Sequence, residues 1–273
     1  MTSINHLSDF IDSAESGGKL NLRTADIAKS LPNVSAEALR QALQRQQRKG
    51  RIVRASRGSG HWVIVPLQNA TAGAPPLETW LHAYLAKTLG IPYYVGLLSA
   101  AECYGASPYA VMVTQVIVPK PRRPLRVGRH QLVFIGRSNV ESMPTQWYET
   151  VNGRFKVSTP ELTALELVLR QELVGGPSRV FEVLQAMAKT FSKEGMRIAL
   201  DAAHEIPATQ RLGALFALGG QKQMANLVHD WLRDKHTRIV SLTPDDANNE
   251  PTQLNQLFKV NIPLYLGSAT GIE

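Results

Sequence analysis

Residues 35–62 read as one helix followed directly by a short hairpin, and both parts are cationic. The first half places Leu39, Ala42 and Leu43 at helical spacing, so that one face of the helix is apolar. The chain then runs RIVRA, SRGSG, HWVIV through residue 65, in which β-branched and aromatic runs flank a Gly–Ser turn. A chain with this order has to pack a helix against a two-stranded hairpin.

Two shorter helices are predicted before this segment. Residues 4–16 carry apolar side chains at spacings of three and four, which is typical of one buried helix face. A second helix is expected to begin at Thr24, with its hydroxyl as the cap, and to end before Pro32, because proline pushes the preceding residue out of helical geometry. Ser35 is the expected N-cap of the third helix. Three helices and a basic hairpin predict a winged helix-turn-helix over residues 1–66.

The exposed face of the third helix predicts contact with DNA. After Glu37 the helix carries no acid, whereas a solvated helix would usually mix charges of both signs. Amide and guanidinium groups can reach bases and phosphates, and the hairpin tip can touch the flanking backbone or the minor groove. The predicted base-reading residues are Arg40, Gln41 and Gln44. The predicted contacts to phosphates and flanking DNA are Arg45, Arg48, Lys49, Arg51, Arg54 and Arg57, together with Ser35 and Ser59.

The charge distribution favours this interpretation. The chain of 273 residues has a formal net charge of +8 and a pI near 9.7, which suggests a polyanionic partner. Residues 1–66 hold ten Lys or Arg against five Asp or Glu, so the excess is concentrated there. Two alternatives stay open for this segment: a small helical domain with a solvated basic face, and a winged helix that contacts protein.

A composition break separates this segment from the rest of the chain. The stretch PLQNATAGAPP is rich in small residues, Gly and Pro, and predicts a linker at residues 67–76. Strand-like and helical patterns follow over residues 77–273, which predicts a larger α/β domain. The fold class expected for the whole chain is therefore mixed α+β.

A basic loop is predicted inside this second domain. It reads KPRRPLRVGR and lies between the predicted strands YAVMVTQVIVP and HQLVFIG. It is either a solvated, proline-stiffened connection or a second contact to the nucleic acid backbone. The residues that would make the secondary backbone contacts are Lys120, Arg122, Arg123, Arg126 and Arg129.

Sequence motifs for catalysis or metal binding are absent. The chain contains no HExxH, GxSxG or GxxxxGK[ST] pattern, and its single cysteine, Cys103, excludes an internal disulfide and a Cys-rich metal site. It has no apolar run long enough to span a bilayer, and its first residues do not fit a signal peptide. We therefore expect a cytoplasmic protein that is not an enzyme, with no catalytic residues, metal, cofactor or membrane partner.

Four motifs resemble a known family. IPYYVGLLSAAECYG, QVIVPKPRR, VSTPELTALELVL and RLGALFALGG occur in this order, and the chain is similar to the AbiEi-type antitoxins of bacterial type IV toxin–antitoxin and abortive phage-infection systems. The similarity runs over nearly the whole chain. The sequence departs from the family pattern in three places. Leu162 and Thr163 occupy a position that is basic in the family and the position next to it. Glu166 stands where Asp is usual, and Phe258 precedes KVN where Trp is common.

The resemblance implies a function for each domain. Members repress transcription of their own operon by binding double-stranded DNA, and they counteract a nucleotidyltransferase-like toxin without a stable complex, in phage defence. The operator should hold repeated or inverted half-sites, because one winged helix reads only a few base pairs. Two alternatives stay open: a plain winged-helix transcription regulator whose C-terminal domain senses a ligand or a partner, and a winged-helix-guided DNA-processing enzyme.

Overall fold

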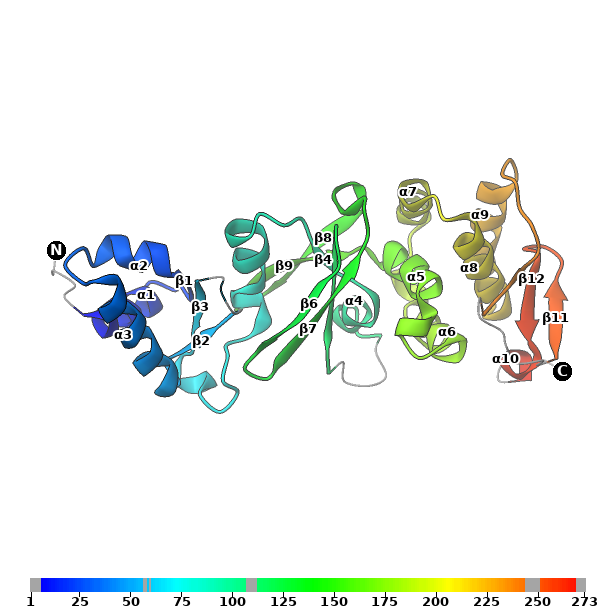
Figure 1. The fold of residues 1–273 in the computed structure, drawn as a ribbon. Helices are drawn as coiled ribbons and strands as arrows, with labels where there is room; N and C mark the ends of the chain where they lie inside the picture. The colour runs from blue at the N-terminus through cyan, green and yellow to red at the C-terminus, as the bar shows by residue number, and fades with distance from the viewer. Residues whose placement is uncertain (1–5, 56–57, 59, 107–111, 244–250, 269–273) are drawn as a thin grey trace. The chain divides into compact units, whose positions relative to one another are not determined.

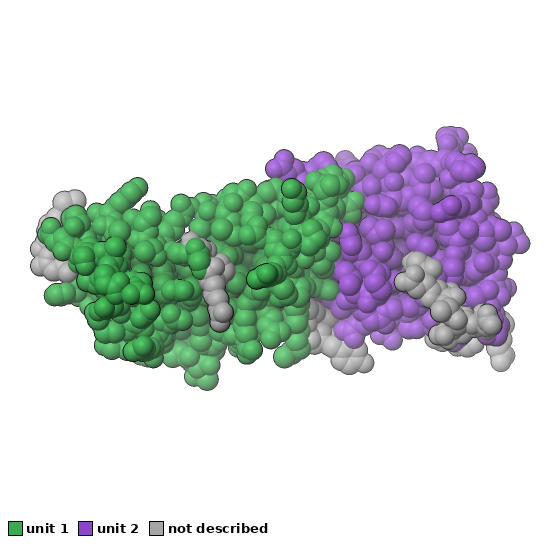
Figure 2. All heavy atoms as spheres, viewed as in Figure 1, with its two compact units in different colours: residues 1–94, 112–140, 147–156 green, residues 95–111, 141–146, 157–273 purple. Residues whose placement is uncertain are grey.

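The fold is mixed α+β, as predicted, and it divides into two compact units (Figure 2). The computed structural model describes residues 6–55, 58, 60–106, 112–243 and 251–268. The first unit comprises residues 1–94, 112–140 and 147–156, and the second comprises residues 95–111, 141–146 and 157–273. The predicted linker at residues 67–76 lies within the first unit, and its role as a domain boundary stays a prediction.

The N-terminal segment consists of three helices and a three-stranded antiparallel sheet (Figure 1). Its helices are α1 (Leu7–Ser16), α2 (Thr24–Ser30) and α3 (Ala36–Arg48). Its strands are β1 (Asn21–Arg23), β2 (Ile52–Arg54) and β3 (His61–Ile64), in the order β1-β3-β2. The three helices and the hairpin strands β2 and β3 confirm the predicted elements, whereas β1 was not predicted.

One apolar core closes the N-terminal segment. Its buried members come from all three helices and all three strands, and every one of them lies between Leu7 and Ile64. Leu39 and Leu43 of α3 belong to it, which confirms the predicted apolar face of that helix. The segment therefore buries its own apolar side chains.

The two predicted helix caps have different outcomes. Ser35 caps α3 as predicted, and its hydroxyl accepts a hydrogen bond from the Ala38 amide at 3.2 Å. Thr24 is instead the first residue of α2 and does not cap it, so that prediction was wrong. Its hydroxyl donates to the Gly60 carbonyl at 3.1 Å and accepts from the Trp62 indole nitrogen at 3.0 Å. The Thr24 hydroxyl therefore ties α2 to β3.

Residues 77–90 pack against the N-terminal segment within the first unit. They form a 3₁₀ turn (Leu77–Thr79) and a π-helix (Ala83–Thr88). His61 is fully buried beneath them, with Nδ1 3.1 Å from the Thr88 hydroxyl and Nε2 3.1 Å from the Asn21 side-chain oxygen. The Asn21 amide in turn donates to the Thr79 carbonyl at 3.1 Å. His61 therefore links β3 to residues outside the N-terminal core.

A six-stranded sheet has the order β6-β7-β5-β4-β9-β8. Strand β7 pairs in parallel with β5 and antiparallel with β6, which lies at one edge. The division between the two units passes through β4, β8 and β9. The strands are β4 (Tyr94–Val95), β5 (Thr114–Val118), β6 (Arg122–Val127), β7 (His130–Gly136), β8 (Thr145–Thr150) and β9 (Gly153–Ser158).

Strand β6 corrects the sequence prediction. The segment KPRRPLRVGR was expected to be a loop, but six of its residues form an edge strand. Pro124 lies within that strand, where a proline is tolerated because an edge strand leaves one side without ladder hydrogen bonds. The register with β7 shifts between Arg122 and Leu125, as expected for an irregularity at the proline.

The second unit is mostly helical. Helix α5 begins as predicted, with the Thr159 hydroxyl accepting from the Leu162 amide at 3.3 Å and Pro160 in the first turn. A small sheet near the C-terminus has the order β10-β12-β11. The helices are α4 (Leu97–Cys103), α5 (Pro160–Leu169), α6 (Pro177–Ala186), α7 (Lys193–Ala203), α8 (Ile206–Leu218), α9 (Lys222–Leu232) and α10 (Leu264–Ser268). The strands are β10 (Val240–Ser241), β11 (Thr252–Asn255) and β12 (Val260–Pro263).

Candidate nucleic-acid interface

Helix α3 presents a polar, mostly cationic face opposite its buried leucines. The predicted contacts on this face are all exposed: Arg40, Gln41, Gln44, Arg45 and Arg48, followed by Lys49 at the helix end. Ser35 is exposed as well, but its hydroxyl is already used as the cap. The arrangement suits recognition of an anion, because the basic groups point away from the core that anchors the helix.

Glu37 holds two of the three predicted base-reading residues. Arg40 donates to its carboxylate twice, at 2.7 and 3.0 Å, and Gln41 donates to it at 3.0 Å. The hydrogen bond from Arg40, and then that from Gln41, lower the pKa of the Glu37 carboxyl. Arg40 and Gln41 would have to leave this acid to read a base. Gln44 makes no such contact with Glu37.

Arg51 is held by the first helix. Its guanidinium lies 2.5 Å from an Asp12 carboxylate oxygen and 2.9 Å from a Glu15 carboxylate oxygen. These two ion pairs join β2 to α1, and they compete with any phosphate for the same guanidinium. Among the predicted phosphate contacts, Arg51 therefore has the clearest structural role.

Arg54 is supported by an aromatic ring. Its guanidinium carbon lies 4.6 Å from the centre of the Trp62 ring, within cation–π distance. Because Trp62 is buried in the N-terminal core, this contact orients Arg54 along the surface beside α3. The predicted hairpin-tip contacts Arg57 and Ser59 lie outside the described residues.

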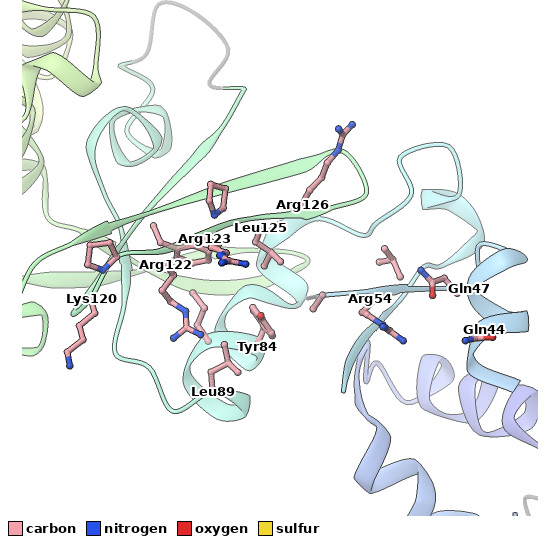
Figure 3. A pocket seen from close by; sticks show the side chains of 16 residues that line it. Gln44, Gln47, Arg54, Tyr84, Leu89, Lys120, Arg122, Arg123, Leu125 and Arg126 are labelled. Carbon is pink, nitrogen blue, oxygen red and sulfur yellow. The ribbon is translucent and has the colours of Figure 1, made fainter. Parts of the chain in front are cut away.

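A groove of about 1090 Å³ brings together residues that the sequence placed in two different domains (Figure 3). Gln44 and Gln47 of α3 and Arg54 of β2 line it on one side, and the basic residues of the β6 segment line it on the other. Its apolar lining includes the buried side chains of Leu85 and Leu125. All sixteen lining residues belong to the first unit, and none of them is Asp or Glu.

Four of the five predicted secondary contacts line this groove. They are Lys120, Arg122, Arg123 and Arg126, and all four are exposed. Arg129 is also exposed but does not line the groove, and its backbone amide donates to the Ala72 carbonyl at 3.1 Å. The basic segment is therefore split, because β6 and the two residues before it line the groove, whereas Arg129 does not.

The sequence prediction missed Gln47. It lines the groove beside Gln44 and is exposed. Helical spacing could have predicted it, because residues three apart on a helix, such as Gln44 and Gln47, share a face. Trp62 and Thr24 were also missed as supports of this surface. No short motif predicts their contact, since it joins α2 to β3 across 38 residues.

A buried polar network fixes the start of α5 in the second unit. The Glu161 carboxylate accepts from the amide of Ser192 at 2.7 Å and from its hydroxyl at 3.0 Å, which ties α5 to the N-terminus of α7. The hydroxyls of Ser158 and Thr163 lie 2.7 Å apart, also buried. Leu162 is fully buried, so a long basic side chain there would lose its hydration. This explains why the departure at Leu162 is compatible with the fold.

Two kinds of feature are absent from the described residues. In residues 6–243 and 251–268, apart from the short gaps, no group of three or more His, Cys, Asp or Glu side chains is placed to hold a metal ion. Within the same described residues, no helix combines the length and the apolar character that a membrane crossing requires.

The fold resembles that of a known structure. The crystal structure of the RV2827C protein from Mycobacterium tuberculosis is similar with a TM-score of 0.68 and 16% sequence identity. The likeness covers 96% of this chain and 94% of that chain. At this identity it shows the fold alone. No curated protein matches the chain.

A family model matches the middle of the chain. Residues 94–218 match the AbiEi antitoxin C-terminal domain. The matched segment runs from β4 to the end of α8. It contains all or the larger part of each of the four motifs that carried the resemblance. The resemblance to the AbiEi-type antitoxins inferred from the sequence is therefore confirmed over residues 94–218.

Proposed function

We propose that this protein is the antitoxin of a type IV toxin–antitoxin system, that it represses its own operon, and that it counteracts a nucleotidyltransferase-like toxin without a stable complex. The observation that carries the proposal is the AbiEi antitoxin C-terminal domain at residues 94–218. The family is one of antitoxins rather than enzymes. We further propose that the protein acts in the cytoplasm in phage defence.

The N-terminal segment supports the DNA-binding part of the proposal. Its order of helices and its basic hairpin fit a winged helix-turn-helix, in which α3 would enter the major groove. The groove of the first unit lies next to that helix. Side-chain amides and cations line it, and no carboxylate does. One such module reads few base pairs, so we propose an operator with repeated or inverted half-sites.

The antitoxin activity is tested by co-expression. A neighbouring nucleotidyltransferase-like gene should stop growth when it is expressed alone, and this chain should restore growth. The toxin gene is placed behind a promoter without the operator, so that repression cannot explain the rescue. Failure to rescue under these conditions, together with intact operator binding, would support the plain transcription regulator.

Gln44→Ala should weaken operator binding and leave random DNA nearly unaffected. A glutamine amide that pairs with adenine provides about 1–3 kcal/mol of discrimination, which corresponds to roughly 5- to 150-fold in the dissociation constant. Unlike Gln41, Gln44 is not held by Glu37, so no internal bond has to break first. Titration of the variant against operator and random duplexes measures both affinities, and a footprint on the operator should cover two half-sites.

Gln46→Ala is the matched control. Gln46 lies on the same helix but lines a hollow with His6 and Ser8 at the first helix, away from the groove. Its removal should leave operator and random DNA binding unchanged. Equal losses on both DNAs for Gln44→Ala would mean that α3 does not read bases, and the docking of α3 in the major groove would have to be abandoned.

A further inference from the structure

The groove beside α3 combines positive charge with apolar lining residues. Five of its sixteen lining residues are Lys or Arg, and none is Asp or Glu. In the described part of the chain, Lys120, Arg122 and Arg123 form no ion pair with any carboxylate. A cleft with charges of one sign and low-dielectric walls focuses the electric field and attracts the opposite charge. The groove is therefore built to hold anions.

The cations are arranged in a line rather than around one point. They follow the β6 segment from Lys120 to Arg126, a stretch of roughly 20 Å at the rise of an extended strand. Each sugar–phosphate strand of duplex DNA carries one negative charge per about 3.4 Å of helix axis. The array therefore fits a continuous phosphate backbone better than a single phosphate group.

The groove is continuous with the proposed base-reading surface. Gln44 lines it from α3, and Arg54, oriented by Trp62, lines it from β2 (Figure 3). We propose that the groove holds a sugar–phosphate strand of duplex DNA, so that β6 binds the backbone of the same DNA that α3 reads. This inference rests on the DNA binding proposed above, and it adds a contact from outside the winged-helix segment.

A structural role for the β6 charges has to be separated from this one. Charged residues and proline on an edge strand also prevent pairing with strands of other molecules. A charge of either sign serves that purpose, whereas only a positive charge binds phosphate. Reversal of the charge therefore distinguishes the two roles.

The test is the double variant Arg122→Glu/Arg123→Glu in the full chain. Its affinity for random duplex is measured at several salt concentrations. The slope of log K against log salt should become shallower by about 1.8, the value for two lost phosphate contacts. The preference for operator over random DNA should stay within about twofold of the wild type, since backbone contacts carry no sequence information.

Two further variants make the result interpretable. Lys193→Glu/Arg197→Glu changes the net charge by the same amount on exposed positions of α7 in the second unit, and it should leave the slope unchanged. Lys120→Glu lies outside β6 and cannot disturb the strand. Its slope of log K against log salt should therefore become shallower by about 0.9 even if the double variant misfolds.

The outcomes separate the two proposals. A wild type that binds DNA without preferring the operator would contradict the proposed function. A wild type that prefers the operator, with β6 variants that keep its slope, would overturn only the β6 contact. Inorganic pyrophosphate at matched ionic strength should displace DNA no better than chloride does. Saturable displacement that Arg122→Glu/Arg123→Glu removes would identify the groove as a site for free phosphates and overturn the proposal.

Discussion

Trp62→Ala should lower the free energy of unfolding of the N-terminal segment by about 3–5 kcal/mol, the usual cost of truncating a buried aromatic side chain. Trp62 is buried in the core of that segment, and its indole nitrogen donates to the Thr24 hydroxyl at 3.0 Å. Since a whole domain is stable by only about 5–15 kcal/mol, this loss is large. Urea denaturation followed by circular dichroism measures it.

The same substitution should abolish operator binding. Without the ring, Arg54 loses its cation–π contact and α2 loses its tie to β3, so the surface beside α3 is no longer fixed. Trp147→Ala is the matched control, because Trp147 lies on β8 with 38% of its surface exposed. It should cost about 1 kcal/mol, the scale of its cation–π contact with Arg154. Equal stability of Trp62→Ala and Trp147→Ala would refute this account.

The sequence predicted the elements whose signals are local. Ser35 and Thr159 were recognised as caps because the hydroxyl and the amide it bonds are three residues apart. Strand β6 was missed because its Arg and Pro content is typical of a loop, and only pairing with β7 makes it a strand. Strand β1 was missed because three residues contain too little periodicity, although Leu22 pairs with Trp62 in β3.

The candidate interface was predictable in its parts but not in its assembly. The exposed face of α3 followed from helical spacing, and even the hydrogen bonds that Arg40 and Gln41 donate to Glu37 are the expected contacts at spacings of three and four. No local pattern could place Arg122 opposite Gln44, since the two are joined only by the tertiary fold. The groove is therefore a finding of the structure.

His61 gives the first unit a predictable pH dependence. The residue is fully buried, and burial, followed by the charge of Arg23, lowers its pKa from 6.5 to about 4. Its ring packs edge-on against Tyr84 with centroids 4.8 Å apart, and both nitrogens have hydrogen-bond partners. The folded protein therefore holds this imidazole neutral, whereas the unfolded chain protonates it near pH 6.5.

The protein should lose about 2 kcal/mol of stability through His61 between pH 7.5 and pH 5. Because the pKa is lower in the folded state, the stabilisation is complete above pH 6.5 and decreases as the pH falls toward 4. His61→Gln removes the titrating group. Between pH 7.5 and pH 5 the variant should therefore lose about 2 kcal/mol less unfolding free energy than the wild type does. Urea denaturation of both proteins at the two pH values isolates this contribution from that of other histidines. Parallel pH profiles for wild type and variant would show that His61 is not held neutral by the fold, and the contact of β3 with residues 77–90 would then not depend on its charge state.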